Sequence, residues 1–281
     1  MLKQRIITAL VLLAILLPAL FWPSPQPFIA VVLVLVAAGT WEFARLNGFG
    51  PGASITAGGA CVLLCALAWW LGLPYQRLPL LWLAVGALWV LGAGLLLRRG
   101  VPGWPLLPRP LRLAGGMSVL VLAWLAAAQA RAIGINFLLS ILVLVWVADV
   151  AAYFAGRAFG LKIASVRLAP TISPGKSWEG VWGGMVAVLL LAVAWSWADL
   201  SAGSAVPSLY ASLAHRSWVL LVVGTLFLVS MSVAGDLLES LVKRSAGAKD
   251  SSQLLPGHGG VLDRVDALLP ALPLAMMLVS I

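Results

Sequence analysis

Charged residues are scarce in this sequence. They make up 10% of its 281 residues, against about a quarter in soluble domains, while 62% of the chain is hydrophobic. A single globule of this length cannot bury so much apolar surface, which excludes an ordinary soluble domain. The apolar runs are long and continuous rather than short and alternating. The sequence therefore predicts an all-α polytopic integral membrane protein and excludes a transmembrane barrel.

Cysteine and acidic residues are also rare. The two cysteines, Cys61 and Cys65, lie four residues apart in an apolar run, so a disulfide framework or metal site is not expected there. Only nine acidic residues accompany 18 Lys and Arg, which gives a formal net charge of +9. In a membrane protein such basic residues determine topology and attract anionic head groups. Membrane lipids, and not nucleic acid, are therefore the expected partners.

Nine apolar runs of roughly membrane-spanning length fill the chain. Most approach the 17–25 residues that cross a bilayer, and the last is short and interrupted by Pro270 and Pro273. The runs cover residues 6–22, 28–46, 53–73, 78–97, 113–130, 133–155, 181–198, 218–235 and 265–281. The first is interpreted as a retained span rather than a signal peptide, because no clear cleavage site follows it.

The basic residues support this segmentation. If the N-terminus is cytoplasmic, nine spans place all Lys and Arg inside except Arg77, Arg131 and Arg216. Such an asymmetry is typical of membrane proteins, and a missed span would scramble it. The sequence therefore predicts a cytoplasmic N-terminus and a C-terminus on the other side of the membrane.

Two polar stretches, residues 157–180 and 236–264, both fall on the predicted cytoplasmic side. The second stretch, together with Asp266, holds five of the nine acidic residues. At its beginning, four polar residues recur at helical spacing and share one helix face. These four are Asp236, Ser240, Lys243 and Arg244.

Carboxylates near or within apolar runs are costly unless a cation or a metal accompanies them. This argument applies to Asp236 and to Asp149, for which an ion pair with Arg157 is the alternative to a functional role. It applies less strongly to Glu42, which has Arg45 as a ready partner three residues on. For Asp263 and Asp266, metal binding and capping of the last helix agree equally well with the residues alone.

Residues 256–260 read Pro-Gly-His-Gly-Gly. Glycines let a backbone approach a ligand and present its N–H groups to phosphate. For His258, proton transfer, backbone shaping and phosphate contact all remain open. Lys176 lies in a Gly-Lys-Ser sequence that is not a P-loop, because Pro170 replaces the first glycine, but a lysine there can still contact phosphate.

These residues resemble a known enzyme family. The segments Ser240-x-x-Lys243-Arg244, Lys249-Asp250, Pro256-Gly257-His258-Gly259-Gly260 and Asp263-Arg264-x-Asp266 are similar to the signature of phosphatidate cytidylyltransferases. A second block, from Asp149 through Tyr153, Gly156 and Arg157 to Lys176 and Gly180, resembles the same family. The chain departs from the family at Val150-Ala151 and at Ser252. The first half matches only as a hydrophobic pattern.

The resemblance implies synthesis of CDP-diacylglycerol and pyrophosphate from CTP and phosphatidic acid, in phospholipid biosynthesis. It implies one transmembrane catalytic domain over residues 1–281, with variable spans to about residue 130 and the motifs from about residue 133 onward. The expected location is a bacterial inner membrane with the active site on the cytoplasmic side. A homodimer, and Mg²⁺ as one or two ions with or without a monovalent cation, are further expectations.

The resemblance also implies residue roles. The implied catalytic residues are Asp236, Ser240, Lys243, Arg244, Asp263 and Arg264, of which Asp236 and Asp263 are the implied Mg²⁺ ligands. The implied substrate-binding residues are Asp149, Arg157, Lys176, Lys249, Asp250, Gly257, His258, Gly259, Gly260 and Asp266.

Two other kinds of function would use some of the same residues. A related CTP-dependent lipid enzyme, such as a polyprenol kinase or an archaeal-type cytidylyltransferase, would share part of the chemistry. A transporter would use Asp149 and Asp236 as coupling carboxylates. Transporters usually show paired halves with interrupted helices, and the sequence shows no such repeat.

Overall fold

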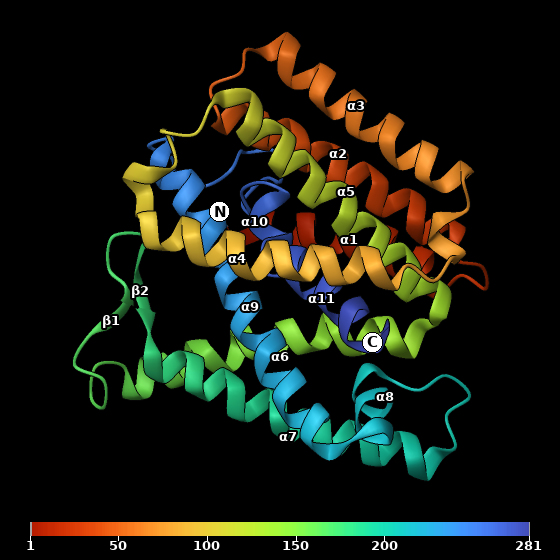
Figure 1. The fold of residues 1–281 in the computed structure, drawn as a ribbon. Coiled ribbons are helices and arrows are strands. Elements are labelled where there is room, and N and C mark those ends of the chain that lie inside the picture. The colour runs from red at the N-terminus through yellow and green to blue at the C-terminus, as the bar shows by residue number, and fades with distance from the viewer. Residues whose placement is uncertain (1, 281) are drawn as a thin grey trace.

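The computed structural model describes residues 2–280, with side chains from Gln4 onward. The side chain of Lys3 and the residue Ile281, which both enter the predictions above, lie outside that range. The described chain forms a bundle of long helices that run back and forth (Figure 1). The long helices are α1 (Leu2–Phe21), α2 (Gln26–Leu46), α3 (Pro51–Trp70), α4 (Pro79–Gly103), α5 (Arg109–Ile133), α6 (Ile135–Phe159), α7 (Trp178–Ala202) and α9 (Trp218–Ser245).

Shorter elements connect and complete this bundle. They are η1 (Leu73–Tyr75), β1 (Arg167–Ala169), β2 (Ser173–Ser177), α8 (Leu209–Arg216), α10 (Leu262–Val265) and α11 (Leu268–Ser280). The two strands form an antiparallel hairpin between α6 and α7, in which Arg167 lies opposite Ser177. Neither this hairpin nor α8 was expected from the hydrophobic pattern.

Within residues 2–280, eight helices are long and apolar enough to cross a membrane, and they are the eight long helices. Their outward faces carry exposed Leu, Val, Ile and Trp side chains. In α1 only 11% of the candidate span is buried inside the bundle. Apolar surface on this scale is stable only against lipid. The prediction of an all-α polytopic membrane protein is therefore confirmed.

The ninth predicted span is built differently from the others. Its helix, α11, has 13 residues and a length of about 20 Å, which is short of the ~30 Å hydrocarbon core. Most of its side chains are buried. Together with α10 it runs back along α9, from an ion pair between Lys243 and Asp263 to a hydrogen bond from Arg216 Nη2 to Val279 O (2.8 Å).

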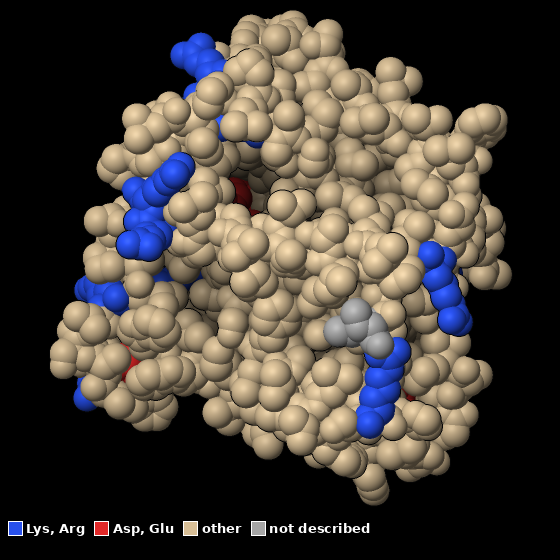
Figure 2. Space-filling model, in the orientation of Figure 1, with Lys and Arg blue, Asp and Glu red and all other residues tan. Residues whose placement is uncertain are grey.

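The two ends of the bundle differ in charge. Figure 2 shows Lys and Arg atoms mostly along one edge, with fewer at the opposite edge. The start of α1 lies at the basic end, where Arg5 Nε donates to Gly257 O (2.9 Å) and Thr8 Oγ1 donates to Pro256 O (2.9 Å). The end of α11 lies beside Arg216, at the other end of the bundle. This arrangement agrees with the predicted alternation, while the side of the membrane on which each end lies stays a prediction.

Two buried tryptophan side chains in the core find hydrogen-bond acceptors within the bundle. Trp82 Nε1 donates to Gln129 Oε1 (2.9 Å), and Trp124 Nε1 donates to Ile29 O (3.0 Å). Such pairing is needed because an unpaired polar group in hydrocarbon costs several kcal/mol. Cys61 and Cys65 are both buried and free, as expected for packing residues.

Candidate functional site at the basic end of the bundle

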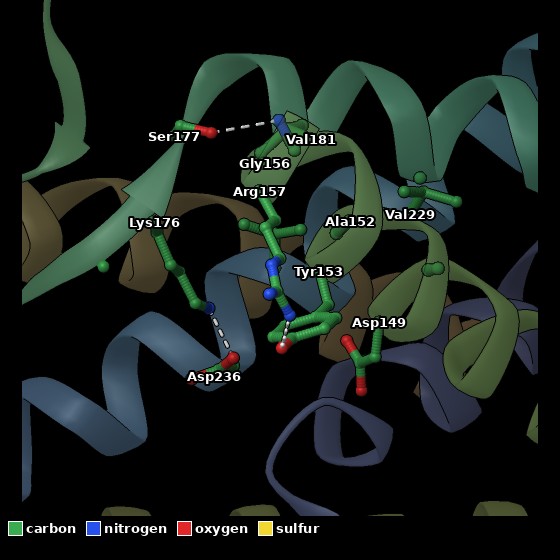
Figure 3. A pocket seen from close by; sticks show the side chains of 15 residues that line it. Asp149, Ala152, Tyr153, Gly156, Arg157, Lys176, Ser177, Val181, Val229 and Asp236 are labelled. Atoms are coloured by element: carbon green, nitrogen blue, oxygen red, sulfur yellow. Dashed lines mark hydrogen bonds and ion pairs between the residues drawn. The ribbon is translucent and has the colours of Figure 1, made fainter. Parts of the chain in front are cut away.

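A pocket of about 430 Å³ opens at the basic end of the bundle, between α6, β2, the start of α7, and α9. Figure 3 shows four charged side chains directed into it from three elements. Asp149 and Arg157 come from α6, Lys176 from β2 and Asp236 from α9. The structure thus brings together the two polar blocks that the sequence singled out.

The wall of the pocket depends on the close approach of α6 and α7. A Cβ atom on Gly183 would collide with Ala155 Cβ, and one on Gly180 would lie 2.9 Å from Ala152 O. Small residues permit such close packing of helices in membranes. Ser177 begins α7 as its N-cap, accepting a hydrogen bond from Gly180 N (3.2 Å), so Lys176 directly precedes the helix.

Lys176 forms an ion pair with Asp236 across the pocket, although the two residues are 60 positions apart. Ser240 Oγ lies 3.4 Å from the other carboxylate oxygen, Asp236 Oδ1. The side chains of Lys176 and Asp236 are 26% and 31% exposed, so a ligand that enters the pocket can reach both. Lys176, a predicted phosphate contact, therefore lies beside Asp236, a predicted metal ligand.

Asp149 forms no ion pair among residues 4–280. Its expected alternative partner, Arg157, instead donates from Nη1 to Tyr153 OH (3.3 Å), so the ion-pair interpretation of Asp149 is wrong. In Figure 3 the carboxylates of Asp149 and Asp236 both line the pocket, with Arg157 and Tyr153 drawn between them. The two carboxylates in the pocket are matched in number by two cationic side chains, Lys176 and Arg157.

A second polar cluster surrounds Asp263, which lies in α10 at the end of the loop after α9. Lys243 Nζ lies 2.6 Å from Asp263 Oδ1 and also pairs with Glu239. Asp263 Oδ2 accepts hydrogen bonds from Ser251 N (2.9 Å), Ser251 Oγ (3.0 Å) and Gly260 N (2.8 Å). Burial opposes ionisation of Asp263, but these donors outweigh it and lower the pKa to about 2.

The structure adds to what the sequence showed about Lys243 and the loop glycines. The side chain of Lys243 is 12% exposed, so it is a largely buried ion-pair partner. The glycines of the loop are needed for its own packing. Gly259 has a φ of +85°, and a Cβ on Gly260 would lie 2.6 Å from Glu42 Oε1. Phosphate binding by this loop stays a prediction.

The remaining predicted residues lie around this cluster. Arg264 Nε donates to His258 O (3.1 Å), and Arg244 Nε donates to Ile172 O (3.4 Å). His258 Nδ1 is buried without a hydrogen-bond partner among the described residues. Asp266 Oδ1 accepts from the backbone N–H of the next residue, Ala267 (2.8 Å), just before α11, so the capping role stays a prediction. Exposed positions in the same loop are occupied by Lys249 and Asp250.

The donor groups of the pocket fit a hard divalent cation in part. Within residues 2–280, no three His, Cys, Asp or Glu side chains form a group ready to hold a metal. Asp236 and Asp149 present carboxylate oxygens to the pocket, which is the chemistry that Mg²⁺ prefers. Both oxygens of Asp263 are already engaged by protein donors. The two implied Mg²⁺ ligands therefore lie in neighbouring clusters rather than in one ready-made group.

Glu42 and Glu179 have structural roles that the sequence did not reveal. Arg45 lies over the Trp41 ring at 4.9 Å, so the suggested Glu42–Arg45 pair is wrong, and Glu42 instead contacts the loop around Asp263. Glu179 Oε1 accepts from Ile163 N (3.0 Å) and Ala164 N (2.7 Å) and so holds the chain after α6. The one feature of the sequence that could have indicated these roles is that carboxylates such as Glu42 and Glu179 are rare in apolar surroundings.

The fold and this site define an integral membrane protein with a charged pocket at the basic end of a helical bundle. The model of the cytidylyltransferase family matches residues 3–281, and the chain belongs to that family. A curated phosphatidate cytidylyltransferase from Pseudomonas aeruginosa is 40% identical over 277 residues, which cover 97% of this chain and 95% of the relative. One from Haemophilus influenzae is 36% identical over 306 residues, covering 97% and 96%. One from Brucella suis is 47% identical over 123 residues, covering 44% and 39%. The resemblance found in the sequence is confirmed.

Proposed function

We propose that this chain transfers the cytidylyl group of CTP to phosphatidate, forming CDP-diacylglycerol and pyrophosphate. The observation that carries the proposal is the match over 97% of the chain to an enzyme named for this reaction. The pocket supports it, because cationic and carboxylate groups gather at the end of a bundle with lipid-facing sides. A transporter is disfavoured by this family membership.

The reaction requires a phosphate oxygen of phosphatidate to attack the α-phosphorus of CTP. A new P–O–P linkage forms, the bond from the α-phosphorus to the bridging oxygen breaks, and its electron pair leaves with pyrophosphate. The attacking oxygen is already an anion near neutral pH, because the second pKa of a phosphomonoester is about 6. No strong general base is needed, which agrees with a site rich in charges and poor in histidine.

Catalysis of such a reaction depends on positioning and on charge compensation around the phosphates. We assign Lys176 and Arg157, which line the pocket, to the phosphate oxygens of the substrates. Further cations come from the end of α9 and the segment that follows it, namely Arg244, Lys249 and Arg264. Lys243 orders Asp263 and Glu239 from within the protein. Ser240 supports the Asp236 carboxylate from the same face of α9.

We further propose Mg²⁺ as the cofactor, held by Asp236 with Asp263, and with Asp149 facing the same pocket. When bound, a divalent cation neutralises phosphate charge and polarises the bond to the leaving group. In the described arrangement Asp263 could bind a metal ion only if it gave up part of its contact with Lys243 or Ser251.

The proposed setting is the cytoplasmic side of a bacterial inner membrane. The basic end of the bundle would face the cytoplasm, where CTP is present, while phosphatidate enters from the bilayer. Assembly into a homodimer is a separate proposal, which the mass of the detergent-solubilised particle would test.

Purified protein incubated with CTP, Mg²⁺ and phosphatidate micelles tests the proposal. We expect a lipid product containing cytidine, formed together with an equal amount of pyrophosphate and lost when EDTA removes Mg²⁺. Diacylglycerol and polyprenol serve as alternative acceptors, and neither should yield product. Product formed only from polyprenol would contradict the proposed substrate.

A further inference from the structure

The Glu42 carboxylate on α2 makes more contacts with the loop after α9 than any role described above requires. Its side chain is fully buried. Oε1 accepts hydrogen bonds from Ser252 Oγ (2.6 Å) and Val261 N (2.9 Å). Oε2 accepts from Ser251 Oγ (3.0 Å) and Leu262 N (2.9 Å). One buried charge from the N-terminal half thus fixes both ends of residues 251–262.

Two of these donors belong to the beginning of α10. The first N–H groups of a helix have no partners within the helix and need acceptors from elsewhere. Glu42 supplies those acceptors to Val261 and Leu262, and an ionised acceptor makes the stronger kind of hydrogen bond. Asp263 is the next residue in the chain. The position of its backbone is therefore set by a side chain of α2.

Ser251 connects Glu42 directly to Asp263. Its Oγ lies 3.0 Å from Glu42 Oε2 and 3.0 Å from Asp263 Oδ2. A hydroxyl group has one proton and can donate it to only one of these oxygens at a time. If Asp263 Oδ2 turns to another ligand, the Ser251 hydroxyl still has Glu42 as an acceptor. Without Glu42, release of Asp263 would leave a buried hydroxyl unpaired, which is costly.

We propose that Glu42 is a positioning residue for the transfer reaction. It holds residues 251–262 against α2 and, through Ser251, keeps Asp263 free to exchange its partners. This inference rests on the proposed function, because it assumes that Asp263 serves that reaction. It also accounts for Gly260, where any side chain would collide with Ser251 and Glu42.

The test compares Glu42→Gln with Asp199→Asn in the full-length protein in detergent. A glutamine directs an NH₂ group at two donors and so loses about half of the four hydrogen bonds. Asp199 is a matched control, because it is a buried carboxylate that accepts from Ser208 N (2.7 Å) and Asn136 Nδ2 (2.9 Å) near the other end of the bundle.

The first readout is hydrogen exchange of backbone amides without substrate. We expect residues 251–262 to exchange about tenfold faster or more in Glu42→Gln, since each lost charged hydrogen bond weakens protection by about that factor. Asp199→Asn should accelerate exchange around residues 204–208 and leave residues 251–262 unchanged. Equal exchange of residues 251–262 in folded Glu42→Gln and wild-type protein would overturn the proposal.

The second readout is the Mg²⁺ concentration that gives half-maximal transfer. We expect Glu42→Gln to raise it about tenfold or more and to recover most of the maximal turnover at saturating Mg²⁺, because Asp263 is displaced rather than removed. Asp199→Asn should leave it unchanged. A Glu42→Gln variant with wild-type Mg²⁺ dependence would restrict Glu42 to a structural role and so contradict the proposal.

Ser252→Ala decides the question if Glu42→Gln does not accumulate in the membrane. It removes the 2.6 Å hydrogen bond from Ser252 to Glu42 and also the acceptor of Leu254 N (3.0 Å). We therefore expect a smaller acceleration, read at the amides of Val261 and Leu262, because both donate to Glu42. Unchanged exchange in Ser252→Ala would then overturn the proposal. If the wild-type protein makes no CDP-diacylglycerol, the proposed function fails, and the exchange comparison still shows whether Glu42 holds the loop.

Discussion

Asp236 joins the two polar blocks of the chain, because it pairs with Lys176 across the pocket. Asparagine in its place keeps the shape but loses the charge that pairs with Lys176 and would retain a hard cation. We expect Asp236→Asn to lower transfer by about 10²–10³-fold. Thermal stability should hardly change, because a partly exposed ion pair contributes about 0–1 kcal/mol. Turnover and melting of the purified variant check this, and near-normal turnover would remove Asp236 from the reaction.

Lys243 differs from the exposed lysines because it is enclosed between two carboxylates. Lys243→Met leaves Glu239 and Asp263 buried without a cation, and breaking a buried pair costs about 3–5 kcal/mol. The exposed Lys249 is the matched control, and Lys249→Met should change stability by less than about 0.5 kcal/mol. Thermal unfolding of both variants in detergent measures the difference. Equal stability would show that Lys243 is not needed to compensate these carboxylates.

Variants at Asp263 and Asp266 distinguish a capping role from the proposed metal-binding role. Asp266→Asn keeps a carbonyl oxygen that accepts from Ala267 N, so we expect a moderate loss of activity. Asp263→Asn loses its pair with Lys243 and the charge that would bind Mg²⁺, so transfer should be abolished. Steady-state assays of both variants, normalised to folded protein, provide the comparison. Substantial activity in Asp263→Asn would contradict its role as a ligand.

At the scale of elements, the contact between α6 and α7 depends on glycine. Gly183→Ala places a methyl group against Ala155 and, by overpacking, should destabilise the protein by about 1–3 kcal/mol. Gly92 on α4 has open space around its Cβ position, so Gly92→Ala should be neutral or stabilising by up to about 1 kcal/mol. Thermal unfolding should therefore show a lower stability for Gly183→Ala and an unchanged or higher stability for Gly92→Ala. Similar effects at both positions would show that the helices do not require this close approach.

The sequence could predict features that depend on local pattern, but not features that depend on tertiary contacts. The second predicted span, residues 28–46, agrees with α2, since the length of an apolar run is a local property. The pairing of Lys176 with Asp236 and of Glu42 with Ser251 could not be predicted, because partner choice depends on which helices pack together. Local reasoning instead assigned Arg45 to Glu42 as its nearest cation. The ninth predicted run, residues 265–281, contains the short α11, but its burial inside the bundle could not be predicted from the run alone.

At the scale of the whole molecule, the termini lie at opposite ends of the bundle (Figure 1). The excess of Lys and Arg at the end where α1 begins predicts that this end is cytoplasmic. A reporter fused after Ile281 should therefore be active only if it functions outside the cytoplasm, and one fused before Met1 should show the reverse. A cytoplasmic reporter at the C-terminus would overturn the topology.

The central claim is that the whole molecule transfers a cytidylyl group and not a terminal phosphate. CTP labelled at the α-phosphorus and CTP labelled at the γ-phosphorus distinguish these reactions when each is supplied with phosphatidate and Mg²⁺. The account predicts that the α-label enters the lipid product and that the γ-label appears only in pyrophosphate. Asp236→Asn should strongly slow the formation of both labelled products. Transfer of the γ-label to lipid would identify a CTP-dependent kinase and contradict the account.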